Sequence, residues 1–185
     1  MPRKNMSRKI IYYVAVSADG FIARPDGAVD WLDRPQPTGG YGMAEFDKTV
    51  DTLILGRKTY DFAVQHGMKD PYPGKKSYVF SRTLKQPASD KVEIVTEDAG
   101  SFARRLRAQK GKDIWLMGGG EIAAAFLDAG ELDEVNAHVI PVLIGEGIPL
   151  FAPRHRNLPL KLLRTETFPD GAVLMHYAVP SSLAR

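Results

Sequence analysis

Residues 114–127 read IWLMGGGEIAAAFL and change character in the middle. The apolar residues before the glycines predict a buried strand, and the alanine-rich residues after them predict a helix. Three successive glycines at 118–120 separate the two and leave the backbone without side chains. A ligand can approach such a backbone closely, and free N–H groups at a helix start attract phosphate. The stretch therefore predicts either a phosphate or dinucleotide site or simply a tight strand-to-helix turn.

The rest of the chain repeats this alternation of strand and helix patterns. We expect further strands at 10–16, 52–55, 77–80, 92–95 and 132–139, and helices at 43–50, 57–65 and around 102–106. Residues 160–168 and 172–179 alternate around a Pro-Asp-Gly turn, which predicts a C-terminal hairpin. The sequence thus predicts an α/β fold with a mixed, mainly parallel sheet, helices on both faces and a C-terminal antiparallel hairpin.

The composition is that of a single globular domain. The chain has 185 residues, of which 44% are hydrophobic and 25% are charged, enough to bury a sizeable core. We place the domain at residues 9–180 and expect the basic residues 1–8 to form a disordered arm. No apolar run approaches the roughly 20 residues that span a bilayer, so we expect no membrane partner.

Several kinds of site are excluded or disfavoured by composition. The chain has no cysteine, which excludes disulfides, thiolate nucleophiles and cysteine zinc sites and fits a reducing, cytoplasmic location. Its four histidines show no metal-binding spacing, so we expect no metal site. The basic residues at 104–112 fall on an expected amphipathic helix without interleaved aromatic residues, and we expect no nucleic-acid partner.

Three segments with ligand-binding character follow predicted strands. They are Gly-Arg-Lys-Thr at 56–59, Ser-Arg-Thr at 81–83 and the glycines at 118–120. The carboxyl ends of parallel strands meet at one edge of a sheet, where ligands bind. Taken alone, each segment is better explained as a helix start or a surface charge, but together they suit a nucleotide with several phosphates. Arg82 beside Ser81 suits a ribose 2′-phosphate, because guanidinium makes bidentate charge-assisted contacts, and this favours NADPH over NADH.

A Rossmann-type dehydrogenase is a weaker interpretation of the same glycines. Residues 118–123 fit the pattern G-x-G-x-x-A. In that motif the glycines follow the first strand, and an acidic residue lies about 20 positions later. Here the glycines come late in the chain, and the residue at that distance is near His138.

Five motifs, in order, resemble the dihydrofolate reductase superfamily. They are VSADGFIA at 16–23, LGRKTY at 55–60, VFSRT at 79–83, WLMGGG at 115–120 and PVLIGEGIPLF at 141–151. Within that superfamily, residues 9–179 are similar to orphan reductases related to the C-terminal reductase domain of the bifunctional riboflavin-biosynthesis deaminase/reductase. The resemblance implies a dihydrofolate reductase-like three-layer fold and an NADPH-dependent reductase. Its substrate would be a small polar heterocycle of the pyrimidine or pterin type, as in 5-amino-6-(5-phosphoribosylamino)uracil reductase.

The resemblance also implies roles for particular positions. The cofactor would contact the end of the first strand, the three polar segments and the residues around the glycines: Ala15, Ser17, Gly56, Arg57, Lys58, Thr59, Ser81, Arg82, Met117, Gly118, Gly119, Gly120, Glu121 and Ile122. The loop after Asp19 resembles the mobile lid of dihydrofolate reductases. The riboflavin-pathway reductases pair through their sheets, so we expect a homodimer, with the apolar residues of 140–157 as candidate contacts.

The substrate side departs from the family patterns. Dihydrofolate reductases carry a carboxylate at a position that falls near residues 40–42, where this chain has none, and the riboflavin-pathway glutamate before the glycines is Met117 here. We expect the substrate pocket to include Asp19, Phe21, Trp31 and Phe46. Asp19 is the candidate catalytic acid, although it is equally a turn residue of an Asp-Gly pair. The missing carboxylate leaves a second hypothesis open, a catalytically silent nucleotide-binding protein.

Overall fold

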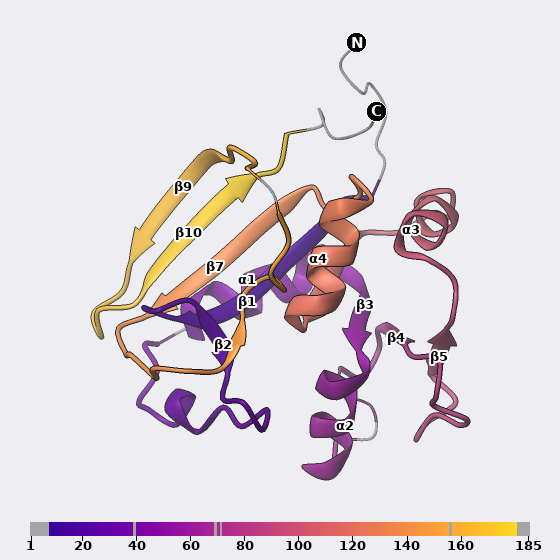
Figure 1. Ribbon diagram of the computed structural model, residues 1–185, viewed down its shortest axis with the longest axis horizontal. Helices are drawn as coiled ribbons and strands as arrows, with labels where there is room; N and C mark the ends of the chain where they lie inside the picture. The colour runs from indigo at the N-terminus through magenta and orange to yellow at the C-terminus, as the bar shows by residue number, and fades with distance from the viewer. Residues whose placement is uncertain (1–7, 39, 69, 71, 156, 181–185) are drawn as a thin grey trace.

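The computed structural model describes residues 8–38, 40–68, 70, 72–155 and 157–180. An eight-stranded sheet forms its centre (Figure 1). The strands are β1 (Ile10–Ser17), β3 (Val50–Gly56), β4 (Lys76–Phe80), β5 (Val92–Val95), β6 (Asp113–Gly118), β7 (Glu134–Ile140), β9 (Lys161–Thr167) and β10 (Val173–Ala178). They lie in the order β5-β4-β3-β6-β1-β7-β10-β9. The first six are parallel, and β10 is antiparallel to both β7 and β9, which confirms the mainly parallel sheet and the terminal hairpin.

Helices cover both faces of the sheet and complete the three layers. They are α1 (Met43–Thr49), α2 (Arg57–Gln65), α3 (Ala99–Arg107) and α4 (Gly120–Asp128). Helices α3 and α4 pack on one face through residues such as Phe102 and Phe126. Helices α1 and α2 pack on the other, where Tyr60 joins a cluster around Trp115. The predicted α/β architecture is therefore confirmed.

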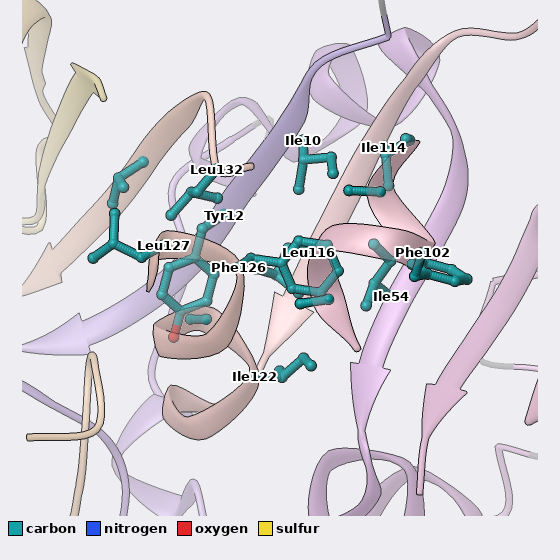
Figure 2. Packing of buried hydrophobic residues seen from close by; sticks show 14 of the residues in the cluster. Ile10, Tyr12, Ile54, Phe102, Ile114, Leu116, Ile122, Phe126, Leu127 and Leu132 are labelled. Carbon is teal, nitrogen blue, oxygen red and sulfur yellow. The ribbon is translucent and has the colours of Figure 1, made fainter. Parts of the chain in front are cut away.

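The larger core fills the space between the sheet and α4. Figure 2 shows Tyr12 and Leu116 on the strands facing Phe126 of α4. All three side chains are completely buried, and Phe126 also meets the ring of Phe80 edge to face at 5.6 Å. This packing holds α4 against the sheet; the helix begins at Gly120, two residues after β6 ends at Gly118.

Two expected irregular segments contain short regular elements. The loop at 21–42 includes β2 (Phe21–Ala23) and single turns at Asp30–Leu32 and Gly40–Gly42. Strand β2 pairs with β8 (Ile148–Pro149) from the Gly/Pro-rich 140–157 segment. Pairings of two or three residues leave no periodic pattern in a sequence, so the sequence did not predict them.

The start of the domain is one residue earlier than expected. Residues 1–7 of the expected arm lie outside the described part of the chain. Arg8, the last residue assigned to that arm, is only 6% exposed. Its guanidinium pairs with the Asp51 carboxylate and donates to Thr52 Oγ1 at 2.6 Å. Within the described ranges, no helix has the length and apolar character needed to cross a bilayer.

Candidate cofactor and substrate site

The candidate site begins where β3 and β6 end side by side. In their parallel register Leu55 lies opposite Gly118. A Cβ added to Gly56 would lie 3.4 Å from both the Gly118 oxygen and the Gly119 nitrogen. Two glycine-containing segments that are 62 positions apart, at 56 and 118, therefore touch at one edge of the sheet.

Two helices start at this contact. Gly56 precedes α2 and Gly119 precedes α4, and neither residue has a side chain that could cap the helix. The first N–H groups of a helix have no partner within it, and its N-terminus carries a partial positive charge. Two such ends side by side suit the two phosphates of a dinucleotide.

The three glycines of the motif serve different purposes. A Cβ on Gly118 or Gly119 would meet nothing closer than 3.7 Å, where Thr59 Oγ1 lies. A Cβ on Gly120 would lie 2.3 Å from the Pro149 oxygen. Packing alone therefore requires glycine at 120. Position 119 has room for a side chain, and its bare backbone leaves a space bounded by Thr59 for a ligand.

The second polar segment lies next to the start of α2. Arg57 donates through Nε to Asp61 at 2.7 Å and through Nη1 to Thr83 Oγ1 at 3.4 Å. Ser81 Oγ accepts hydrogen bonds from the backbone of the residues that follow it, which shapes the turn. Arg82 is exposed, and within the described residues no carboxylate pairs with it. This edge therefore holds one guanidinium that is partly engaged and one that is free to meet an anion.

The other expected cofactor residues divide into those that face solvent and those in the core. Lys58 lines a groove of about 250 Å³ together with residues 25–27 of the loop. The Glu121 side chain is 80% exposed and pairs with Arg154 at 2.9 Å. Ile122 is buried in the core and Met117 packs against the opposite cluster. The Ile122 and Met117 side chains are therefore engaged in packing, whereas the Glu121 side chain faces solvent.

The end of β1 is tied to the 140–157 segment by Asp19. Its carboxylate accepts hydrogen bonds from Ser17 Oγ at 2.6 Å and from the backbone nitrogens of Ile144 and Gly145 at 3.1 and 2.7 Å. The bond from Ser17, followed by those from the backbone, lowers the pKa of Asp19 below its ordinary value. An ionised carboxylate held in this way joins two loops. The catalytic role of Asp19 stays a prediction.

The expected substrate-pocket residues lie in different surroundings. Trp31 is 8% exposed and packs with Ile140 in a small cluster on the α1 side of the sheet. Phe46 stacks on Tyr13 with ring centroids 4.2 Å apart. Phe21 belongs instead to the β2–β8 pair, opposite Pro149. The neighbouring acid Glu45 is exposed.

One residue of this region was missed by the sequence analysis. His138 on β7, which received no site role there, is 2% exposed and lies opposite Ala15. Its ring centroid is 4.6 Å from that of Tyr13. Burial is the main cause that lowers the pKa of His138 to about 4, with Glu166 opposing and Arg164 adding to the effect. The only signal in the sequence was its inward position in an apolar strand. No three His, Asp or Glu side chains in the described part of the chain are grouped to hold a metal.

Comparison with known proteins places this geometry in a family. The model of the RibD C-terminal domain matches residues 8–174. The uncharacterized protein YwjB of Bacillus subtilis is 41% identical over 172 residues, which cover 93% of this chain and 98% of YwjB.

Solved structures share the fold. A Shewanella sp. PV-4 protein assigned by name to riboflavin biosynthesis has a TM-score of 0.83 at 29% identity, covering 93% of this chain and 99% of that one. The Thermotoga maritima diaminohydroxyphosphoribosylaminopyrimidine deaminase/5-amino-6-(5-phosphoribosylamino)uracil reductase scores 0.70 at 16% identity, over 94% of this chain and 57% of that one. Dihydrofolate reductase from Enterococcus faecalis, complexed with NADP(H), has a TM-score of 0.68 at 15% identity. The match covers 94% of this chain and 98% of that one. The last two likenesses concern the fold alone.

The glycines give a paired prediction. Gly119→Ala should fold with an unchanged melting temperature, because its Cβ has room, yet it should lose NADPH binding by at least about tenfold, since the methyl group occupies the ligand's approach. Gly120→Ala should instead lower the melting temperature, because its Cβ meets the Pro149 oxygen. Thermal unfolding and NADPH fluorescence titration measure the two effects. Normal NADPH affinity in a folded Gly119→Ala protein would show that the glycine motif is only a tight strand-to-helix turn.

His138 gives a prediction about pH. Its pKa of about 4, against an ordinary value of 6.5, means that between these values the unfolded chain binds a proton that the folded chain does not. Acid therefore favours unfolding, by about 2 kcal/mol between pH 7 and pH 5. Urea unfolding at these two pH values should show that loss in the parent protein and a smaller one in His138→Leu. An equal loss in both proteins would contradict the assignment.

Proposed function

The chain belongs to the RibD C-terminal domain family, and we propose that it is a cytoplasmic NADPH-dependent reductase that transfers hydride to a small polar heterocycle of the pyrimidine or pterin type. The observation that carries the proposal is the contact between Gly56 and Gly118, from which two uncapped helices begin. The family and the fold it shares with an NADP(H)-bound dihydrofolate reductase support it.

The residues present fit such a cofactor. The backbone at Gly118 and Gly119 and the N-termini of α2 and α4 would hold the pyrophosphate, with the Thr59 hydroxyl beside them. Arg82, together with Nη2 of Arg57, would hold the 2′-phosphate. The backbone of β1 around Ala15 would flank the nicotinamide. NADPH, when bound, supplies the hydride, and the buried aromatic residues of the α1 side would keep water from that position.

No carboxylate lies in the described residues 40–42, where the family resemblance implies the acid that protonates a pterin. Residues 40–42 form a turn without a carboxylate, and the nearby Asp47 pairs with Lys75 at 3.3 Å. General acid help contributes about 10²–10⁴-fold to a rate. The proposal therefore favours a pyrimidine-type substrate, such as the uracil named for the Thermotoga maritima enzyme, over dihydrofolate.

Two other functions differ in how they fit the structure. A Rossmann-type dehydrogenase is disfavoured, because its strand order is 3-2-1-4-5-6 with the glycines after the first strand, whereas here they follow β6, between β3 and β1. A catalytically silent nucleotide-binding protein shares the same cofactor site and is favoured by the missing carboxylate. Only turnover separates it from the reductase.

Cofactor choice tests the phosphate-binding edge. NADPH should bind more tightly than NADH, and Arg82→Ala should lose roughly 1.5–3 kcal/mol of NADPH binding, which is one charge-assisted contact. NADH affinity should not change, since it lacks the 2′-phosphate. Lys85→Ala, which removes the same charge from the same exposed turn, is the matched control and should leave both affinities unchanged. Equal affinities of the parent protein for the two cofactors would contradict the assignment.

Turnover tests the reaction. We expect the protein to oxidise NADPH in the presence of 5-amino-6-(5-phosphoribosylamino)uracil or a related pyrimidine, and to reduce dihydrofolate about 10²-fold more slowly because the acid is missing. The decrease in absorbance of the reduced nicotinamide measures both rates. Binding of NADPH without oxidation across such a panel would favour the silent protein, and rapid reduction of dihydrofolate would contradict the assigned substrate class.

We also propose a homodimer, but through a different surface from the one that the sequence analysis favoured. Ile140, one of the expected contacts in 140–157, is 1% exposed and belongs to the core, whereas Leu143 is 75% exposed. Edge strand β9 is exposed along its whole length, including Leu162 at 52% and Leu163 at 45%. An exposed edge strand can pair with another strand, and Leu162 and Leu163 give part of this one an apolar surface.

Light scattering tests the dimer. The parent protein should have twice the monomer mass at micromolar concentration, and Leu162→Asp should shift it to the monomer mass, because a charge in an apolar interface is costly. Leu143→Asp, on the 140–157 segment, is the control and should leave the mass unchanged. A monomeric parent protein would refute the proposal.

A further inference from the structure

The α1 side of the sheet holds buried polar groups that the proposed cofactor site does not use. Neither ring nitrogen of His138 has a hydrogen-bond partner among the residues that the structure describes, and the same is true of the Trp31 indole nitrogen. His138 is 2% exposed and Trp31 is 8% exposed. A buried polar group left without a partner costs about 1–3 kcal/mol, and native proteins keep few of them. We therefore expect the His138 ring and the Trp31 indole nitrogen to have a hydrogen-bond partner.

The two side chains lie at the same end of β7. His138 and Ile140 alternate onto one face of that strand, and Trp31 packs against Ile140. On β1, Ala15 lies opposite His138 and Ser17 opposite Ile140. The unpartnered groups thus lie beside the strand end that would flank the nicotinamide.

Aromatic rings surround the imidazole. The ring centroids of Tyr13, Tyr41 and Phe168 lie 4.6, 6.0 and 6.2 Å from that of His138. Such rings form walls for a flat molecule. A neutral imidazole offers one hydrogen-bond donor and one acceptor, and an indole offers one donor. The chemistry of this enclosure matches an uncharged planar heterocycle with both donor and acceptor groups on its edge.

Tyr41 is a partly buried wall of the enclosure. Its φ of 59° lies in the left-handed region, and the glycines on both sides, Gly40 and Gly42, also have positive φ. That backbone is unfavourable by roughly 1–2 kcal/mol for a residue with a Cβ. The Tyr41 hydroxyl donates to Asp170 Oδ2 at 2.5 Å, and the Tyr13 hydroxyl donates to the Tyr41 oxygen at 3.2 Å. A strained residue between two glycines, held by two hydrogen bonds, is suited to move as a cap.

We propose that His138 is the substrate-contacting residue of the reductase, that it hydrogen-bonds the edge of an uncharged planar heterocycle with Trp31 beside it, and that Tyr41 swings aside to admit the ligand. This inference rests on the proposed function, because it places the heterocycle next to the nicotinamide. It assigns recognition to a neutral imidazole at a site that lacks the carboxylate of dihydrofolate reductases.

Lumazine, a fluorescent pteridine-2,4-dione, is a suitable probe. Fluorescence titration of the NADP⁺-loaded protein should show saturable binding of lumazine. His138→Leu should weaken it at least about tenfold, which is about 1.4 kcal/mol, and His138→Gln, which keeps a donor and an acceptor, should recover part of the loss. His176→Phe is the control, because His176 lies on the neighbouring strand and pairs with Glu134 at 2.9 Å. NADPH affinity should stay within about twofold in all of these variants, since the site for the cofactor's phosphates lies elsewhere.

Each outcome decides one part of the proposal. Equal lumazine affinity in the parent protein and His138→Leu would overturn the role of His138. The hydrogen-bond partner of its ring would then be a trapped water molecule. NADPH binding without lumazine binding in the parent protein would overturn this inference and leave the proposed cofactor function intact, whereas loss of both would overturn that function as well. Tyr41→Phe, which removes the bond to Asp170, should raise the association rate of lumazine several-fold, and an unchanged rate would overturn the cap.

Discussion

The contact between the ends of β3 and β6 is the constraint on which the rest of the structure depends. These strands are parallel neighbours, so their carboxyl ends lie at the same edge, and Gly56 reaches the backbone of Gly118 and Gly119. Both strands then turn directly into helices, α2 on one face and α4 on the other. A Cβ at position 56 would already be in van der Waals contact with both of these backbone atoms. The absence of side chains at this point therefore serves packing and leaves the N–H groups of two helices facing one space.

The candidate site has two halves of opposite character. The first is polar and exposed: it consists of helix starts, Arg57 and Arg82, and suits the phosphates of a nucleotide. The second is buried and aromatic, and lies between β1, β7 and α1, where His138 is enclosed by rings. Strand β1 joins the halves, because it pairs with β6 on one side and β7 on the other. Asp19 fixes the end of that strand to the 140–157 segment through Ile144 and Gly145.

The sequence predicted the fold well where local patterns are strong. The elements around 57–65, 92–95 and 114–127 lie where periodicity and the glycines placed them, and the terminal hairpin was visible from its turn. Grouping the three polar segments at one edge followed from the rule for parallel strands, and the contact between Arg57 and Thr83 agrees with it. What the sequence did not reveal depends on long-range contacts. The burial of Arg8 depends on its ion pair with Asp51. Glycine is required at 120 because the Pro149 oxygen lies next to it, and no local pattern indicates the position of Pro149. His138 was missed because its inward position in an apolar strand does not show that its ring nitrogens lack partners until its neighbours on β1 and β10 are known.

The central claim is that the backbone between β6 and α4, together with the start of α2, binds the cofactor phosphates. Backbone amide NMR of the isotope-labelled protein during titration with NADPH tests it most directly. The largest shift changes should fall on the amides of residues 56–58 and 118–122, with smaller changes at Arg82. Changes confined to another surface, such as the exposed edge strand β9, or no changes at all, would contradict the account.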